Sequence, residues 1–507
     1  MKLGRKILLV LALLLLALAV WVVTKPHVGK TALEDYRKQL AARGEKMSVE
    51  QLAPQFTAEE LDAGRDLMDA VSRLVGGYRF AAPAMVMIAP GRAAITWNQE
   101  VWPSADFSND WPNVRKEVLF HSNALENLRA ALKQPLGGLK LDYAQGWSLP
   151  LPHLGQLKGA AIGLLYASRL ELHDGKVDES LEDLKACIVF THFSEREPII
   201  ISQLVRVAII NMAFQNTWEI LQYPGLNDRQ LAELQRAWES AGVITNMPAI
   251  FEMERVMNAI AFEKARRGEM DARAVLSPGP RTASPTSLPA KVEEWVEEFR
   301  YKMWKKRWSY DEELCISQTL QAGMDALRDM QSNAPFAGRV KKASSEYDAI
   351  FNSFTNVNTK FVMGPGGIYG CLRKFAITDT ARELILTAIA LKRYQIAHQH
   401  YPARLDELVP DFLRAIPLDP MDRKPLRYHP NPDGTFLLYS IGEDGVDDGG
   451  DPMPPKTAST SHIYWTAGRD IVWPVPATPD ETAAFKKKAM DDWVSKHPVE
   501  KTNQPGK

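Results

Sequence analysis

Several aspartates of this chain gather in or near a glycine-rich loop close to the C-terminus. Carboxylates occur at Asp444, Asp447, Asp448 and Asp451, and Asp470 follows after an intervening segment. Calcium takes six to eight oxygen ligands in a flexible geometry, which a glycine-rich acidic loop can supply by wrapping around the ion. The spacing is not that of an EF-hand. These five carboxylates predict a calcium site, and the alternative is an ordinary solvated loop.

Other patterns that carry chemistry are missing from the sequence. It contains no His-Glu-x-x-His zinc motif, no Gly-x-Ser-x-Gly nucleophile elbow, no P-loop and no Rossmann fingerprint. His398 and His400 stand two residues apart at the end of an expected helix, which places them on different faces. Glu252 and Glu254 are most simply surface charges or buried ion-pair partners. We therefore predict no catalytic residue and no organic cofactor site, and we do not expect an enzyme.

The elements around the acidic loop predict a helix packed on a small antiparallel sheet. An apolar stripe at helical spacing covers 379–394, and Pro402 ends that helix because the residue before a proline avoids the α conformation. One short helical turn is expected over 405–409. Strands are expected at 425–428 and 436–440, on either side of a Pro-Asn-Pro-Asp-Gly turn. The acidic loop directly follows the second strand.

The order of short motifs through this region resembles the globular head of the major pseudopilin of type II secretion systems. The matching motifs, in chain order, are Ala390-Leu391-Lys392-Arg393-Tyr394, Tyr401-Pro402, Leu405 to Pro410, Ile416 to Pro420, Leu438 to Ser440, Gly442 to Asp451 and Asp470-Ile471. The resemblance implies a pseudopilin-like α+β domain over 376–478, with calcium held by its acidic loop. The chain departs from the family because it lacks a Gly-Phe-Thr-Leu-x-Glu cleavage signal and carries an insertion at 452–469.

The N-terminus has the layout of a membrane anchor. Three basic residues precede an uninterrupted apolar run of 17 residues, Ile7 to Val23. This length is at the short limit for a transmembrane helix, and the positive flank predicts a cytoplasmic N-terminus. A cleavable signal peptide is the alternative, because Ala17-Leu18-Ala19 has the small-x-small form. Since the apolar run continues past that point, we predict a single-pass anchor over 1–24 and export of the remaining chain to the periplasm.

Residues 25–275 are expected to form an antiparallel helical array. Helical periodicity is strongest at 154–173 and 177–193, which a turn at Asp174-Gly175 joins into a hairpin. This hairpin weakly resembles one tetratricopeptide-type repeat. Further helices are expected at 199–221, 228–241 and 248–267.

Several stretches interrupt or follow this array. Residues 76–115 are punctuated by Gly, Pro and Trp, and we interpret their tryptophans as core filling, with a Trp-lined ligand groove as the alternative. Residues 276–290 form a Pro- and Ser-rich linker. A helical segment is expected at 291–375, whose first, basic and aromatic helix suits a solvated face better than an anionic membrane surface. The charged tail, 479–507, is expected to fray.

Composition sets limits on the partners. The 507 residues are 45% hydrophobic and 24% charged, as in folded proteins, and the net charge of -1 gives no electrostatic basis for binding nucleic acid. Cys187, Cys315 and Cys371 are widely spaced, which predicts buried free thiols instead of a zinc site or a disulfide framework.

Together these features predict a mainly α, membrane-anchored extracytoplasmic protein. It would bind other envelope proteins through its helical array and its pseudopilin-like head, with a secretion or pilus-like assembly among the partners. Two alternatives stay open: a helical-repeat adaptor that binds peptides or proteins in the envelope, and an extracytoplasmic hydrolase whose site sequence patterns do not reveal.

Overall fold

The computed structural model describes residues 28–74, 84–100, 110–244, 247–272, 288–353, 366–454, 465–466 and 468–496. The structure is mainly helical, at 65%, with two small three-stranded sheets. The predicted anchor and most of the predicted linker lie outside the described residues. None of the helices in the described ranges is long and apolar enough to cross a membrane.

The first half of the chain forms the expected helical array. Its elements are α2 (Val28–Ala42), α3 (Val49–Leu52), α4 (Ala58–Ser72), α5 (Trp111–Phe120), α6 (Ser122–Ala131), η1 (Tyr143–Ser148), α7 (Pro152–His173), α8 (Val177–Phe190), α9 (Ile200–Leu221), α10 (Asp228–Ser240) and α11 (Met247–Arg267). Helices α7 and α8 pack as the predicted hairpin, and Gly175 ends α7 with a φ of 76° that glycine adopts without strain. Helices α7 and α9 bury most of their surface, so they form the centre of the array.

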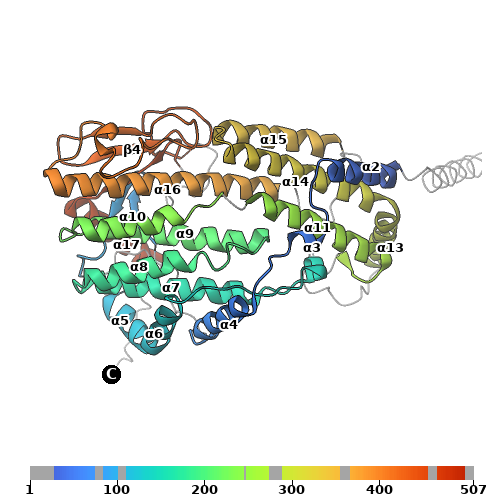
Figure 1. Ribbon diagram of the computed structural model, residues 1–507, viewed down its shortest axis with the longest axis horizontal. Helices are drawn as coiled ribbons and strands as arrows, with labels where there is room; N and C mark the ends of the chain where they lie inside the picture. The colour runs from blue at the N-terminus through green and yellow to red at the C-terminus, as the bar shows by residue number, and fades with distance from the viewer. Residues whose placement is uncertain are drawn as a thin grey trace, which may run out of the picture.

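The second half adds a long helical spine. Its elements are α13 (Leu288–Met303), the π-helical turn η2 (Trp304–Trp308), α14 (Ser309–Gln331), α15 (Phe336–Ser353) and α16 (Gly366–His398). Figure 1 shows α16 with the sheet that contains β4 on one side and α9 and α10 on the other. The predicted boundary between helical segment and head, at 375/376, therefore lies inside one continuous helix of 33 residues. Sequence pattern placed it there because the head's motifs begin only after that point.

The head has the expected helix-on-sheet arrangement. Strands β3 (Arg427–Pro430), β4 (Phe436–Ser440) and β5 (Ile471–Val472) form an antiparallel sheet in the order β3-β4-β5. The short turn before them is the 3-10 helix η3 (Leu405–Leu408). These elements confirm the turn and strand predictions to within a few residues, whereas the helix expected over 379–394 is part of α16, which begins at Gly366.

The second sheet was not predicted. Strands β1 (Val86–Ala89) and β2 (Arg92–Ala94) form a hairpin in the stretch that we interpreted as irregular, and β2 pairs in parallel with β6 (Val475–Pro476). The tail also differs, because α17 (Pro479–Lys496) is a helix that packs near β1, where fraying was expected. Strands of two to four residues are too short to show a period of two, and their partners are distant in sequence.

One hydrophobic core joins the array to the head. The same cluster of buried side chains contains Leu67 of α4, Leu164 of α7, Trp218 of α9, Leu391 of α16 and Ile471 of β5. A head that folds by itself would expose the face of α16 that packs on α9 and α10, so the packing favours a single cooperative unit.

The aromatic and cysteine predictions can be checked in the same core. Trp111 is 3% exposed and stacks on His173 with 4.0 Å between the ring centroids, as core filling predicts. The three cysteines are buried and free, which confirms the thiol prediction.

Candidate functional site

The aspartates of the acidic loop do not share one environment. Asp470 is fully buried and accepts hydrogen bonds from the backbone N–H groups of Gly450 at 2.7 Å, Asp451 at 3.1 Å and Asp448 at 3.4 Å. Burial raises the pKa of Asp470, and these three N–H donors act in the opposite direction. Asp470 thus shapes the loop by binding its backbone.

The other loop carboxylates bind partners within the protein or face solvent. Asp447 contacts the Arg427 guanidinium at 3.2 Å and accepts a hydrogen bond from the Tyr439 hydroxyl at 3.0 Å. Asp451 contacts Arg469 at 3.1 Å, Asp444 accepts from the Val446 N–H of its own turn, and Asp448 is exposed.

No three acidic, histidine or cysteine side chains gather as a metal-binding group in the described part of the chain. As arranged here, the five aspartates do not converge on a position that a calcium ion would need, because guanidinium or backbone N–H groups occupy acceptor directions of Asp447, Asp451 and Asp470 and Asp448 faces solvent. Calcium binding stays a prediction, and it would require the loop to rearrange.

A buried carboxylate that sequence reasoning did not single out holds the acidic side of the head together. Asp419 is fully buried and accepts hydrogen bonds from Met421 N–H at 2.9 Å, Ile441 N–H at 3.0 Å and the Ser440 hydroxyl at 2.8 Å. It also pairs with Arg427 at 2.9 Å. The Ile-Pro-Leu-Asp-Pro motif contained this residue, but its pattern gave no signal that the carboxylate would point inward.

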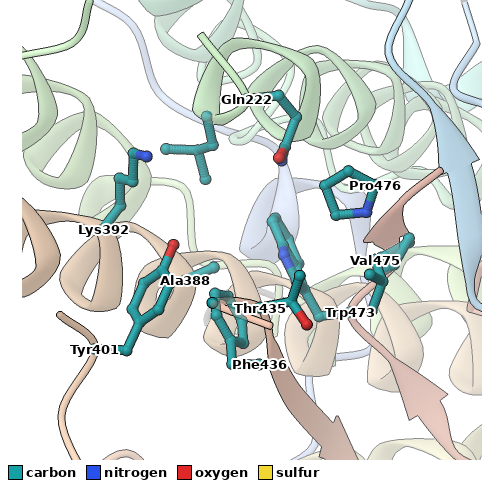
Figure 2. A pocket seen from close by; sticks show the side chains of 12 residues that line it. Gln222, Ala388, Lys392, Tyr401, Thr435, Phe436, Trp473, Val475 and Pro476 are labelled. Atoms are coloured by element: carbon teal, nitrogen blue, oxygen red, sulfur yellow. The ribbon is translucent and has the colours of Figure 1, made fainter. Parts of the chain in front are cut away.

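A pocket lies at the junction of the array and the head. Its volume is about 140 Å³, and it is lined by Leu221, Gln222, Ala388, Lys392, Tyr401, Gly434, Thr435, Phe436, Trp473, Pro474, Val475 and Pro476. These residues come from the end of α9, from α16 and the segment after it, from the turn before β4 and the start of β4, and from the segment between β5 and β6 together with β6. Figure 2 shows the Lys392 side chain and the Tyr401 hydroxyl on one side of this space and Trp473 and Val475 on the other. Sequence analysis did not predict this site, because its walls are far apart in the chain.

Interactions between the array and the head fix the pocket walls. Trp218 of α9 is fully buried, and its indole N–H donates to the Pro474 carbonyl at 2.9 Å. Tyr401 packs edge-on against Phe436, with 5.0 Å between the ring centroids. The first contact joins α9 of the array to the chain after β5, and the second joins two parts of the head, so the α9 side of the pocket depends on the packing of the head against the array.

Lys392 is the charged residue of the pocket, and it has no ion-pair partner among the described residues. Its neighbour on α16, Arg393, instead pairs with Asp228 at 2.7 Å. Burial without a carboxylate lowers the pKa of Lys392. Burial also raises the pKa of Tyr401 to about 12, so its hydroxyl keeps its proton at neutral pH. The pocket therefore presents a cation and a neutral hydroxyl donor beside aromatic and proline walls.

Buried titratable groups also lie inside the array, away from this pocket. Glu171 and Asp183 share the guanidinium of Arg129, which contacts Glu171 at 3.3 Å and Asp183 at 2.5 Å. Burial and the neighbouring Asp183 carboxylate raise the pKa of Glu171 to about 8. His153 contacts Glu197 at 3.2 Å in the buried interior. These groups resemble acid–base pairs in chemistry, but they do not line the pocket in Figure 2.

The remaining candidate residues have structural contacts. Glu252 pairs with Arg328 at 3.2 Å, as one of the two predicted alternatives. Burial raises the pKa of Glu254 to about 7. The rings of His398 and His400 lie 6.2 Å apart, and each ring shares a hydrogen bond with a backbone carbonyl, so they do not form a metal pair.

A comparison of the chain with models of known protein families, with curated proteins and with solved structures returned no match.

Proposed function

We propose that this chain is a membrane-anchored, extracytoplasmic interaction protein that binds a carboxylate group in the pocket between its helical array and its head. The observation that carries the proposal is Lys392, a half-buried cation with no carboxylate partner in the described residues. Burying an unpaired charge costs free energy that a bound anion would offset.

The pocket walls indicate the chemical class of the ligand. Phe436, Trp473 and Pro476 supply an apolar surface beside Lys392, and Tyr401 supplies a hydroxyl donor. Its volume of about 140 Å³ suits one small apolar group with a carboxylate, such as the C-terminal residue of a polypeptide. Such a ligand is part of a protein partner, which agrees with an interaction role and requires no catalytic group.

The anchor and the partner class come from the sequence. The apolar run at 7–23 supports one N-terminal span, with the array and the head in the periplasm. The resemblance of 376–478 to the pseudopilin head makes a secretion or pilus-like assembly the first class of envelope partner to test. We propose no nucleic-acid partner, since the net charge is -1.

Binding can be tested with N-acetyl-leucine and its amide as matched probes. At ten times its Kd, a ligand that binds only the folded state stabilises it by about 1.4 kcal/mol. We expect the carboxylate form to raise the melting temperature of the full chain by roughly 1–3 °C. We expect the amide to have no effect, because it carries no charge for Lys392.

The matched variants are Lys392→Met and Lys374→Met, which remove lysines from the same helix. Lys374 is exposed and outside the pocket. Only Lys392→Met should abolish the response to N-acetyl-leucine. Equal responses to acid and amide, or an unchanged response in Lys392→Met, would reject the carboxylate site.

Topology has its own test. Reporter fusions after Thr24 and at Lys507 should both report an extracytoplasmic location. A cytoplasmic signal from either fusion would reject the anchor and the export.

A further inference from the structure

An exposed apolar stripe runs along α13. Val292, Trp295, Val296 and Phe299 are 54%, 68%, 41% and 51% exposed, and their spacing places them on one helical face. Trp295 and Phe299 stack on each other, with 5.8 Å between the ring centroids. No described element covers them, although four adjacent large apolar side chains are uncommon on a soluble surface.

The opposite side of α13 holds it to the body of the protein. Tyr301 and Trp304 are buried in a small cluster with Phe262 of α11, and the Tyr301 hydroxyl accepts a hydrogen bond from Ala272 N–H at 3.0 Å. The π-helical turn η2 then joins α13 to α14. The stripe is therefore fixed so that it faces away from the helical array.

The position of α13 relative to the predicted anchor identifies what would cover the stripe. Helix α2 packs against α14 and η2, and its Gly29 lies against Asp311 near the start of α14. Only four residues separate Val23, the end of the apolar run, from Val28, the start of α2. Five peptide steps reach at most roughly 18 Å. Figure 1 shows α2 and α13 at the same end of the molecule, so a membrane that holds the anchor must pass near α13.

We propose that α13 is a second membrane contact, whose apolar stripe inserts into the bilayer surface that holds the N-terminal anchor. The chemistry fits the interface of a bilayer, because Trp295 and Phe299 lie on the stripe and Lys306 is exposed two turns later, whereas Lys302 pairs with Glu298 at 3.9 Å. We interpreted this helix as a solvated face from its sequence. Trp304 of η2 is buried, whereas Trp295 on the stripe is exposed.

This contact would set the orientation of the protein. A single contact with a bilayer leaves a domain free to rotate about it, whereas a second contact holds one end of the helical array against the lipid. The pocket lies in the part of the structure formed by the head, α9 and α16, so its distance from the bilayer would then be fixed. The inference rests on the proposed anchor.

The test uses the full chain in lipid nanodiscs that hold one copy each. Val296→Cys receives a polarity-sensitive fluorophore, because the three natural cysteines are buried and do not compete for the label. Glu297→Cys is the matched control, since it is exposed next to Val296 but on another face. A second control, Phe120→Cys, places the label at an 81% exposed aromatic position near the other end of the molecule.

We expect a water-soluble reductant to bleach the Val296→Cys label at least fivefold more slowly than either control label. Equal rates in chains that co-purify with the discs would overturn the α13 contact and leave the anchor intact. Chains that do not enter the discs would reject the anchor itself. Slow bleaching that appears only in discs with two copies would assign the stripe to a second copy of the chain and also overturn the lipid contact.

Discussion

The acidic side of the head, which contains Asp419, Asp422, Asp447 and Asp470, differs from the Lys392 pocket in whether its charged groups have partners within the protein. On the acidic side, Arg427 contacts Asp419, Asp422 and Asp447, and backbone N–H groups hold Asp470. In the pocket, Lys392 has no carboxylate partner among the described residues. In the loop that looked most like a ligand site in the sequence, Asp447, Asp451 and Asp470 have partners within the protein, whereas the cation of the pocket that left no sequence signal has none among the described residues.

This difference shows that a binding site is indicated by a charged group without a partner in the fold, and not by the number of charged residues in a sequence segment. A cluster of like charges in a sequence shows how many charges are present but not whether the fold neutralises them. A single cation at a junction between two parts of the fold can carry more binding potential, because its partner is missing in the free protein.

The largest expected effect is on the acidic side. Asp419→Ala should lower the free energy of unfolding by about 3–5 kcal/mol, because it breaks a buried ion pair and leaves two backbone N–H groups without an acceptor. Asp444→Ala is the control, since Asp444 is exposed and accepts only from its own turn, and it should cost less than about 0.5 kcal/mol. Chemical denaturation measures both. Similar losses for the two variants would contradict internal neutralisation by Asp419.

The next effect is expected in the array, where Glu171 and Asp183 share the single guanidinium of Arg129. A proton on Glu171 removes the repulsion between the two carboxylates. The pKa of Glu171 is about 8 in the folded protein against an ordinary value of 4.5, with Asp183 and Glu179 adding negative charge and Arg129 opposing them. The folded state therefore binds more protons than the unfolded state between these pH values, and stability should fall as the pH rises from about 4.5 to about 8.

Glu171→Gln should remove much of this slope, so its stability relative to the wild type should increase by roughly 3 kcal/mol between pH 5 and pH 8. Glu182→Gln on α8 is the control, because its side chain is 67% exposed. Thermal melting between pH 5 and pH 8 measures the difference. Parallel pH profiles for the wild type and Glu171→Gln would show that the pair is ionised normally.

The smallest expected effect is that of calcium. Because Arg427, Arg469 and backbone N–H groups already engage the loop carboxylates, the full chain should melt within about 1 °C in calcium and in chelator. A rise of several degrees in calcium, lost in Asp444→Asn or Asp470→Asn, would instead show that the loop rearranges around an ion. That result would favour the prediction made from the resemblance to pseudopilins.

Much of the fold could be predicted from local sequence signals. The hairpin of α7 and α8, the capping box at Thr57 and Glu60, and strands β3 and β4 depend on periodicity and turn residues that lie close together in the chain. The parallel pairing of Arg92 with Val475 depends on tertiary contacts across almost the whole chain, and no local pattern encodes it.

The candidate site was hidden for the same reason. Lys392 was part of a recognised motif, but its neighbours in the pocket include Leu221 and Trp473, which are distant in sequence. The roles of the loop aspartates were also not predictable, because whether Asp470 faces an ion or a backbone N–H depends on the path of the loop. The sequence shows which charged residues are present, and only the tertiary structure shows which of them have partners.

The pKa of Lys392, measured with and without a carboxylate probe, tests the central claim most directly. The full chain would carry isotope-labelled dimethyl groups on its lysines, and the resonance missing from Lys392→Arg would assign the residue in the NMR spectrum. We expect a Lys392 pKa below its ordinary value of 10.5 that rises when N-acetyl-leucine is added and stays unchanged with the amide. An ordinary Lys392 pKa that neither probe changes would contradict the proposal that Lys392 is an unpaired cation that binds a carboxylate.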